Sequence, residues 1–144
     1  MKYLVDANVL CEPTRPAPVA AVVEWLRAHE REIVVDPIIL GEIRFGVLLL
    51  RDSRRRRKLE QWFFEGVSRV ECLSWDAATG LVWAELIAKL RRKGKAMPIK
   101  DSLIAATALF HKIPVATRNT RDFLNAGVKV VNPFESRLPT RSKL

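Results

Sequence analysis

The stretch "KYLVDANVL", residues 2–10, joins a short apolar run to the polar side chains that follow it. "KYLV" predicts a buried strand, and Asp6 stands directly after it. The stretch "PVATRNTRDF", residues 114–123, has the same form, because Asn119 and Asp122 follow its apolar start. If both strands are parallel neighbours, these side chains share the rim beyond the carboxyl ends of the strands, where α/β sheets bind ligands.

Strand and helix patterns alternate through the rest of the chain. Apolar runs predict further strands at 32–35, 69–73 and 128–131. Helical spacing of apolar residues, with Asp36–Pro37 and Asp76 as start signals, predicts helices at 18–31, 37–50, 53–66, 77–93 and 101–111. The alternation predicts an α/β fold with a central, mostly parallel sheet of four to five short strands flanked by helices. The helix at 37–50 is apolar nearly all round, so we expect it to be buried.

The length and the charge narrow the class of protein. The chain has 144 residues and a net charge of +9, which fits one basic globular domain at 1–132 with a basic tail at 133–144. A basic surface favours a polyanion partner, nucleic acid first, although a basic protein without such a partner remains an alternative. The longest apolar run, "VLLL", is far short of the roughly 20 residues that cross a bilayer, which argues against a membrane protein. Cys11 and Cys72 form no CxxC pair, which suggests a reducing cytoplasm and no thiolate metal site.

Four acidic residues stand in unusual settings, and each has an ordinary structural explanation. Asp6 fits a turn, Asp101 fits a helix N-cap, and Asp122 fits the cap of a short turn. Glu42 lies within an apolar helix, where a carboxylate needs a partner such as a buried arginine or a metal ion. Together the four suggest more, because carboxylates about 4 Å apart repel by roughly 4 kcal/mol per pair at an effective dielectric near 20. Cations must therefore accompany them, and an all-oxygen set suits Mg²⁺ or Mn²⁺. An acidic cluster on a basic protein suggests metal-assisted phosphodiester hydrolysis.

At this point the sequence resembles a known family. It is similar to the PIN-domain ribonucleases and, within them, to the VapC-type toxins of type II toxin–antitoxin systems. The similarity covers nearly the whole chain, and its order and spacing are more specific than any single motif. Four segments carry it: "LVDANVLCEPTRP" (4–16), "ILGEIRFGV" (39–47), "PIKDSLIAATALFH" (98–111) and "VATRNTRDF" (115–123).

The resemblance implies an endoribonuclease in which a metal-bound water attacks an RNA phosphodiester. It implies one or two Mg²⁺ or Mn²⁺ ions, a homodimer, and inhibition by a small cognate antitoxin. The implied catalytic and metal-binding acids are Asp6, Glu42, Asp101 and Asp122, with Asn8, Thr117 and Asn119 as supporting polar residues. Ala7 departs from the family, which often has Thr there, so no hydroxyl acts at that position.

Basic residues offer the surface for RNA. Arg118 and Arg121 flank the predicted rim and are the candidates for phosphate contact. The run "RRRRK", residues 54–58, fits a solvated helix face, and its functional interpretation is contact with RNA or with an antitoxin. The tryptophans are expected to pack in the core or in an interface.

Two other functions remain open. One is a PIN-fold RNA-processing nuclease without an antitoxin, and another is a non-catalytic RNA-binding module. A phosphoacceptor receiver domain fits poorly, because Asp6 has no acidic neighbour and 117–122 contains no lysine.

Overall fold

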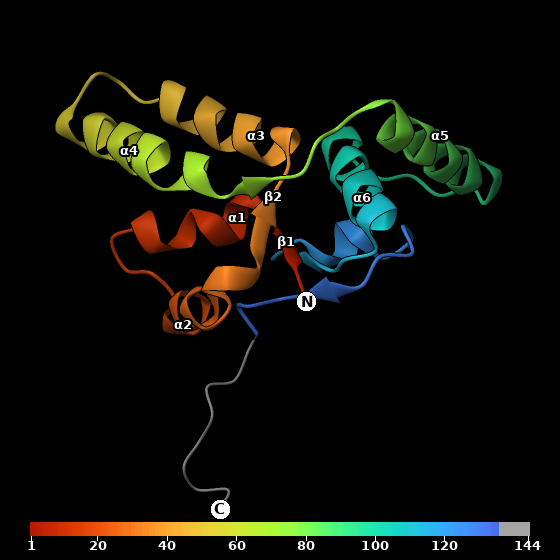
Figure 1. Cartoon of the computed structure of the whole chain (residues 1–144), viewed down its shortest axis with the longest axis horizontal. Coiled ribbons are helices and arrows are strands. Elements are labelled where there is room, and N and C mark those ends of the chain that lie inside the picture. The colour runs from red at the N-terminus through yellow and green to blue at the C-terminus, as the bar shows by residue number, and fades with distance from the viewer. Residues whose placement is uncertain (136–144) are drawn as a thin grey trace, which may run out of the picture.

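A five-stranded parallel sheet forms the centre of the molecule in the computed structural model, which describes residues 1–135 (Figure 1). The strands are β1 (Tyr3–Val5), β2 (Ile33–Val35), β3 (Glu71–Cys72), β4 (Val115–Ala116) and β5 (Val130–Val131). Their order across the sheet is β3-β2-β1-β4-β5, and every neighbouring pair is parallel. The predicted α/β class is therefore confirmed. The predicted tail at 133–144 lies mostly outside the described residues.

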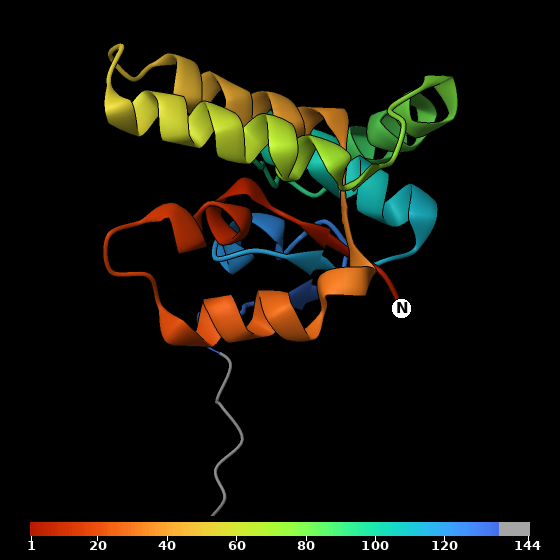
Figure 2. The same ribbon diagram turned by 60° about the vertical axis from the view of Figure 1, so that its left-hand side comes forward.

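Helices cover both faces of this sheet. Figures 1 and 2 show α3 and α4 side by side over one face and α2 on the other, while α5 packs on α6 at one end of the molecule. The α-helices are α1 (Ala7–Leu10), α2 (Ala20–Ala28), α3 (Pro37–Leu48), α4 (Arg54–Glu65), α5 (Ala77–Arg92) and α6 (Ile99–His111). Short 3-10 helices are η1 (Glu12–Thr14), η2 (Glu30–Glu32), η3 (Val67–Arg69) and η4 (Thr120–Phe123). No helix among residues 1–135 is long and apolar enough to cross a membrane.

Two of the predicted helix starts are confirmed by their capping bonds. The Ile39 backbone N–H donates to Asp36 Oδ1 at 2.9 Å, and Pro37 is the first residue of α3. Asp76 caps α5 in the same way. The N-cap interpretation of Asp101 is wrong, because α6 begins two residues earlier and Pro98 is its N-cap. Asp101 therefore lies inside the first turn of α6, where its carboxylate has no capping role.

The prediction that the helix at 37–50 is buried all round is wrong for one face. Ile39, Ile43 and Val47 are buried, as their spacing requires. Phe45 and Leu49, however, are 61% and 69% exposed. The sheet and α4 cover only part of this helix, so its apolar outer face meets solvent in the single chain.

Strand register places polar residues together at one rim. Val5 of β1 pairs with Ala116 of β4, and the Asp6 N–H donates to the Ala116 carbonyl at 2.9 Å. Asp6 and Thr117 are therefore the first residues beyond two adjacent strands. The strands themselves are buried, and the apolar Phe123 of η4 is fully buried beneath the loop that follows β4. The core thus fixes both segments that carry the predicted site.

Candidate active site

Asp6 has its two carboxylate oxygens held by different parts of the chain. It is the N-cap of α1, and the Ala7 N–H donates to Oδ1 at 2.8 Å. The Thr117 hydroxyl donates to Oδ2 at 2.8 Å, and Asn8 Nδ2 donates to Oδ2 at 3.2 Å. Burial raises the pKa of Asp6, while the bonds from Thr117 and Ala7 lower it. Asp6 is thus more than the turn residue that the sequence allowed, since its side chain is held at a defined position on the rim.

The supporting polar residues predicted from the sequence lie around this carboxylate. Asn8 Oδ1 accepts the Arg118 backbone N–H at 3.0 Å, which ties α1 to the loop after β4. The Asn119 backbone N–H donates to Thr117 Oγ1 at 3.0 Å. These bonds join Asn8, Thr117 and Asn119 into one network that orients Asp6.

Asp101 brings a second buried carboxylate to the rim from α6. Its residue is 8% exposed, and two indole groups hold the helix directly beside it. Trp83 Nε1 donates to Ser102 Oγ at 2.9 Å, and Trp75 Nε1 donates to the Leu103 carbonyl at 3.0 Å. These contacts fit the expected packing role of the tryptophans. They also fix the start of α6, and with it the position of Asp101.

The acidity of Asp101 indicates how close the other acids are. Burial is the largest cause of its raised pKa, followed by the nearby carboxylates of Asp6, Asp122 and Glu42 in that order, and together they bring the pKa to about 6. Asp122 lies in η4 and is half-buried. The structure therefore brings all four predicted acids, from four segments of the sequence, into one electrostatic neighbourhood.

Glu42 faces this neighbourhood from α3 and has a partner that the sequence did not indicate. Lys100 Nζ lies 3.0 Å from Glu42 Oε1. The expected alternative, a buried arginine, is not the partner. Hydrogen bonding to Glu42 raises the pKa of Lys100, so the ammonium stays charged. Lys100 stands directly before Asp101 in the sequence, and that adjacency is the only signal that would have identified it.

The chemistry of these donors fits a hard divalent cation. All are carboxylate oxygens, the kind of ligand that Mg²⁺ and Mn²⁺ prefer. Within residues 1–135, no group of three or more Asp, Glu, His or Cys side chains is arranged to hold a metal ion as it stands.

Two arginines flank the rim. Arg118 and Arg121 are both exposed, and the Arg118 guanidinium lies 4.7 Å from the centroid of the Phe134 ring. That contact is a cation–π interaction, which positions the side chain and leaves its charge available. Contact between these arginines and RNA stays a prediction.

The chain is similar to known proteins over nearly its whole length. The model described as PIN domain matches residues 3–129. This chain belongs to the PIN domain family. The PIN domain described above is 33% identical to Toxin FitB of Neisseria gonorrhoeae over 91% of this chain and 97% of the relative. It is 34% identical to VapC ribonuclease Y4jK of Sinorhizobium fredii over 92% of this chain and 97% of the relative.

Solved structures show the same fold. The crystal structure of FitAcB from Neisseria gonorrhoeae matches with a TM-score of 0.87 and 32% identity, covering 93% of this chain and 99% of that one. A toxin–antitoxin complex from Klebsiella pneumoniae matches with a TM-score of 0.69 and 22% identity, covering 92% of this chain and 98% of that one. At 22% identity, the second match supports only the fold of this PIN domain and says nothing about its function.

Proposed function

We propose that this PIN domain is a Mg²⁺- or Mn²⁺-dependent endoribonuclease and the toxin of a toxin–antitoxin pair in the cytoplasm. The observation that carries the proposal is the gathering of four carboxylates, from four segments of the chain, where Asp6, Asp122 and Glu42 all act on Asp101. Acids that perturb one another at a strand rim are characteristic of functional sites. Relatives named as a toxin and as a ribonuclease support the same activity.

In this proposal Asp6, Glu42, Asp101 and Asp122 hold the metal. When bound, the ion would polarise the scissile phosphate and lower the pKa of the attacking water. Thr117 and Asn8 keep Asp6 Oδ2 aimed at the site through their hydrogen bonds. Arg118 and Arg121 neutralise phosphates beside the bond that is cut.

A cleavage assay tests the activity. Wild-type protein should cut single-stranded RNA in the presence of Mn²⁺, and EDTA should abolish the cut. Asp101→Asn should lose nearly all activity, whereas the matched control Asp76→Asn, an exposed helix cap on α5, should keep it. RNA cleavage by Asp101→Asn at the wild-type rate would mean that the acids are wrongly assigned.

Partners of the chain are a separate part of the proposal. We expect a small antitoxin that blocks the acidic site and a homodimer of the toxin. The exposed apolar residues Phe45 of α3 and Leu49, directly after its end, support a self-association surface. Purification from the native host should recover a small protein bound to the chain. Light scattering on the chain alone should give twice the mass of one chain. Recovery of an active enzyme without any such protein would favour the RNA-processing nuclease.

A non-catalytic RNA-binding module is the second candidate. The basic surface suits it, but the set of mutually perturbing acids does not. Calorimetric titration with Mn²⁺ separates the two functions, because a module has no reason to bind the ion.

A further inference from the structure

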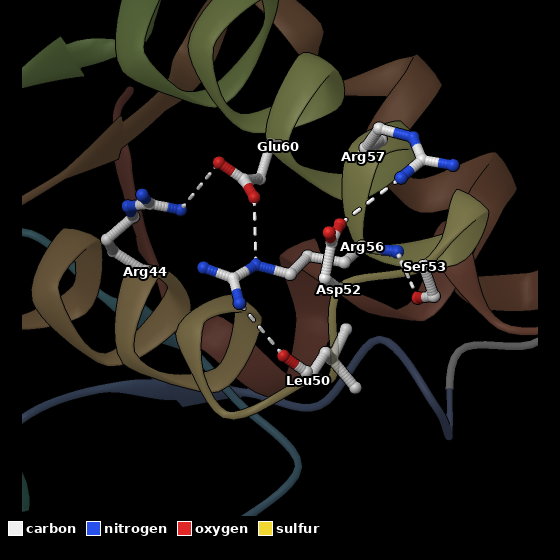
Figure 3. Close-up of polar contacts among 7 residues, drawn as sticks. All are labelled: Arg44, Leu50, Asp52, Ser53, Arg56, Arg57 and Glu60. Atoms are coloured by element: carbon white, nitrogen blue, oxygen red, sulfur yellow. Dashed lines mark hydrogen bonds and ion pairs between the residues drawn. The ribbon is translucent and has the colours of Figure 1, made fainter.

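The basic run at 54–58 divides into two sets according to what its side chains contact. Arg56 Nε donates to Glu60 Oε1 at 2.9 Å, and Arg56 Nη1 donates to the Leu50 carbonyl at 3.1 Å (Figure 3). Arg57 Nη1 lies 3.2 Å from Asp52 Oδ1. Arg56 and Arg57 therefore serve the junction between α3 and α4, where their charges are locally neutralised.

The other set, Arg54, Arg55 and Lys58, has no carboxylate partner within residues 1–135. All three side chains are exposed and line a hollow of about 300 Å³ beside Thr14 of η1. Their spacing places them on one face of α4, which lies toward Thr14 of η1. The positive charges of these three side chains are therefore not neutralised by a carboxylate of the described residues, and they line one side of the hollow.

That hollow continues into a second one that reaches the acidic site. The second hollow, of about 370 Å³, shares Thr14 and Arg55 with the first and extends to Asn8 and Glu42. Because they share lining residues, the two hollows form one groove, with α1 and η1 on one side and α3 and α4 on the other. We call it the α4 groove, and it leads from the N-terminus of α4 to the predicted metal ligands.

The placement of the three cations is electrostatically unfavourable for the free protein. They stand in the first turns of α4, where the positive end of the helix dipole disfavours cations. Arg54 and Lys58 are also four residues apart, a spacing at which like charges repel. An anion in the α4 groove would relieve both effects, whereas an apolar occupant would relieve neither.

The floor of the α4 groove is apolar and aromatic near the acidic site. Cys11, Val47 and Trp62 line it, together with Ile43. Burial raises the pKa of the Cys11 thiol to about 11, so this sulfur is neutral at physiological pH. A floor of this kind suits the flat face of an unstacked base, since single-stranded nucleic acid binds by combining such surfaces with a positive wall.

We propose that the α4 groove holds single-stranded RNA, with phosphates on Arg54, Arg55 and Lys58 and one base on the floor beside Trp62. The strand would run from the acidic site toward the N-terminus of α4. This inference rests on the proposed function for the identity of the ligand. It goes further by placing several nucleotides beyond the cleaved bond and one base beside Trp62.

RNA binding without cleavage tests the α4 groove separately from the acids. A fluorescently labelled single-stranded RNA would be titrated in EDTA, and the anisotropy measured over a range of salt concentrations. The triple variant Arg54→Ala, Arg55→Ala, Lys58→Ala should bind more weakly. Its slope of log affinity against log salt should be smaller by about 2, since each phosphate contact on a single strand contributes roughly 0.7. Arg91→Ala, Arg92→Ala, Lys93→Ala removes the same charge at the far end of α5 and should keep the slope.

Two outcomes would overturn the assignment. One is an unchanged slope of log affinity against log salt in the α4 variant. A smaller slope in the α5 control would strengthen that contradiction. The other is loss of a co-purified small protein from the α4 variant with RNA binding intact, which would assign the groove to a protein. Urea unfolding of both variants separates loss of the groove from loss of the fold.

A crosslink locates the base. RNA carrying one 4-thiouridine, irradiated on wild-type protein in EDTA, should attach to peptides that contain Cys11 or Trp62. Crosslinks confined to α5 and α6 would contradict the proposed floor. If Asp101→Asn cut RNA normally while these crosslinks held, the proposed function would fail and the α4 groove would stand.

Discussion

Lys100 Nζ lies 3.0 Å from Glu42 Oε1, so an ammonium on α6 neutralises the carboxylate that α3 brings to the rim. In the proposed metal site, a divalent ion would compete with this ammonium for the same oxygen. Lys100→Met should therefore bind Mn²⁺ more tightly. Because exposed ion pairs contribute about 0.2–1 kcal/mol, the gain should be roughly one-and-a-half- to fivefold, measured by calorimetry at pH 7.

Lys129→Met is the matched control, since it removes one exposed positive charge away from Glu42. Its affinity for Mn²⁺ should equal that of the wild type. Weaker Mn²⁺ binding by Lys100→Met would show that the ammonium assists the site instead of competing for it.

Asp101 should destabilise the metal-free protein as the pH rises. Its pKa is about 6 in the folded state against an ordinary 3.8, so the folded state binds more protons between these values. The loss of stability is absent below about pH 4 and complete above about pH 6. It lowers the free energy of unfolding by on the order of 2–3 kcal/mol. Asp101→Asn should thus be more stable than wild type at pH 7 in EDTA and nearly equal at pH 4. Urea unfolding at both values measures this difference, and a less stable variant at pH 7 would contradict it.

Much of the fold was predictable from local patterns. The strand at 2–5 and the helix signal at Asp36–Pro37 depend on neighbours in the sequence, and the structure places both within one or two residues. Helix α1 was missed because four residues are too few to show a helical period. The exposed face of α3 was missed because hydrophobicity does not say which neighbours are present to cover it.

The site was predictable in a different way. The strand-rim rule grouped Asp6 with Asp122, and their unusual settings singled out Glu42 and Asp101. The resemblance implied one shared site for all four. Lys100 was missed because its role depends on the distance between α3 and α6, which no local pattern contains. The division of the run at 54–58 was missed for the same reason, since only the positions of Leu50, Asp52 and Glu60 decide which arginines are neutralised.

Thr117 should control both the stability and the ion affinity of the site through Asp6. Its fully buried hydroxyl donates to Asp6 Oδ2 at 2.8 Å. Thr117→Val keeps the shape of the side chain and removes the donor, so it should lower the free energy of unfolding by about 1–3 kcal/mol. Loss of such an orienting partner should also weaken Mn²⁺ binding about ten- to a hundredfold.

Thr117→Ser retains the hydroxyl and serves as the control for that prediction. It should recover most of the Mn²⁺ affinity even if the missing methyl group lowers stability. Equal Mn²⁺ affinities of the Val and Ser variants would show that the hydrogen bond does not orient Asp6.

Asp36 provides the comparison between a structural acid and the acids proposed to bind the metal ion. Burial raises its pKa, as it does for Asp101. However, Asp36 accepts hydrogen bonds from the Ile39 N–H at 2.9 Å and from the Thr107 hydroxyl at 2.7 Å, whereas Asp101 is surrounded by other carboxylates. An asparagine at position 36 can still cap α3 through its side-chain oxygen, so Asp36→Asn should bind Mn²⁺ within about twofold of the wild type. Calorimetry on Asp36→Asn and Asp101→Asn side by side checks this, and equal loss of Mn²⁺ binding in both would extend the ion site to Asp36.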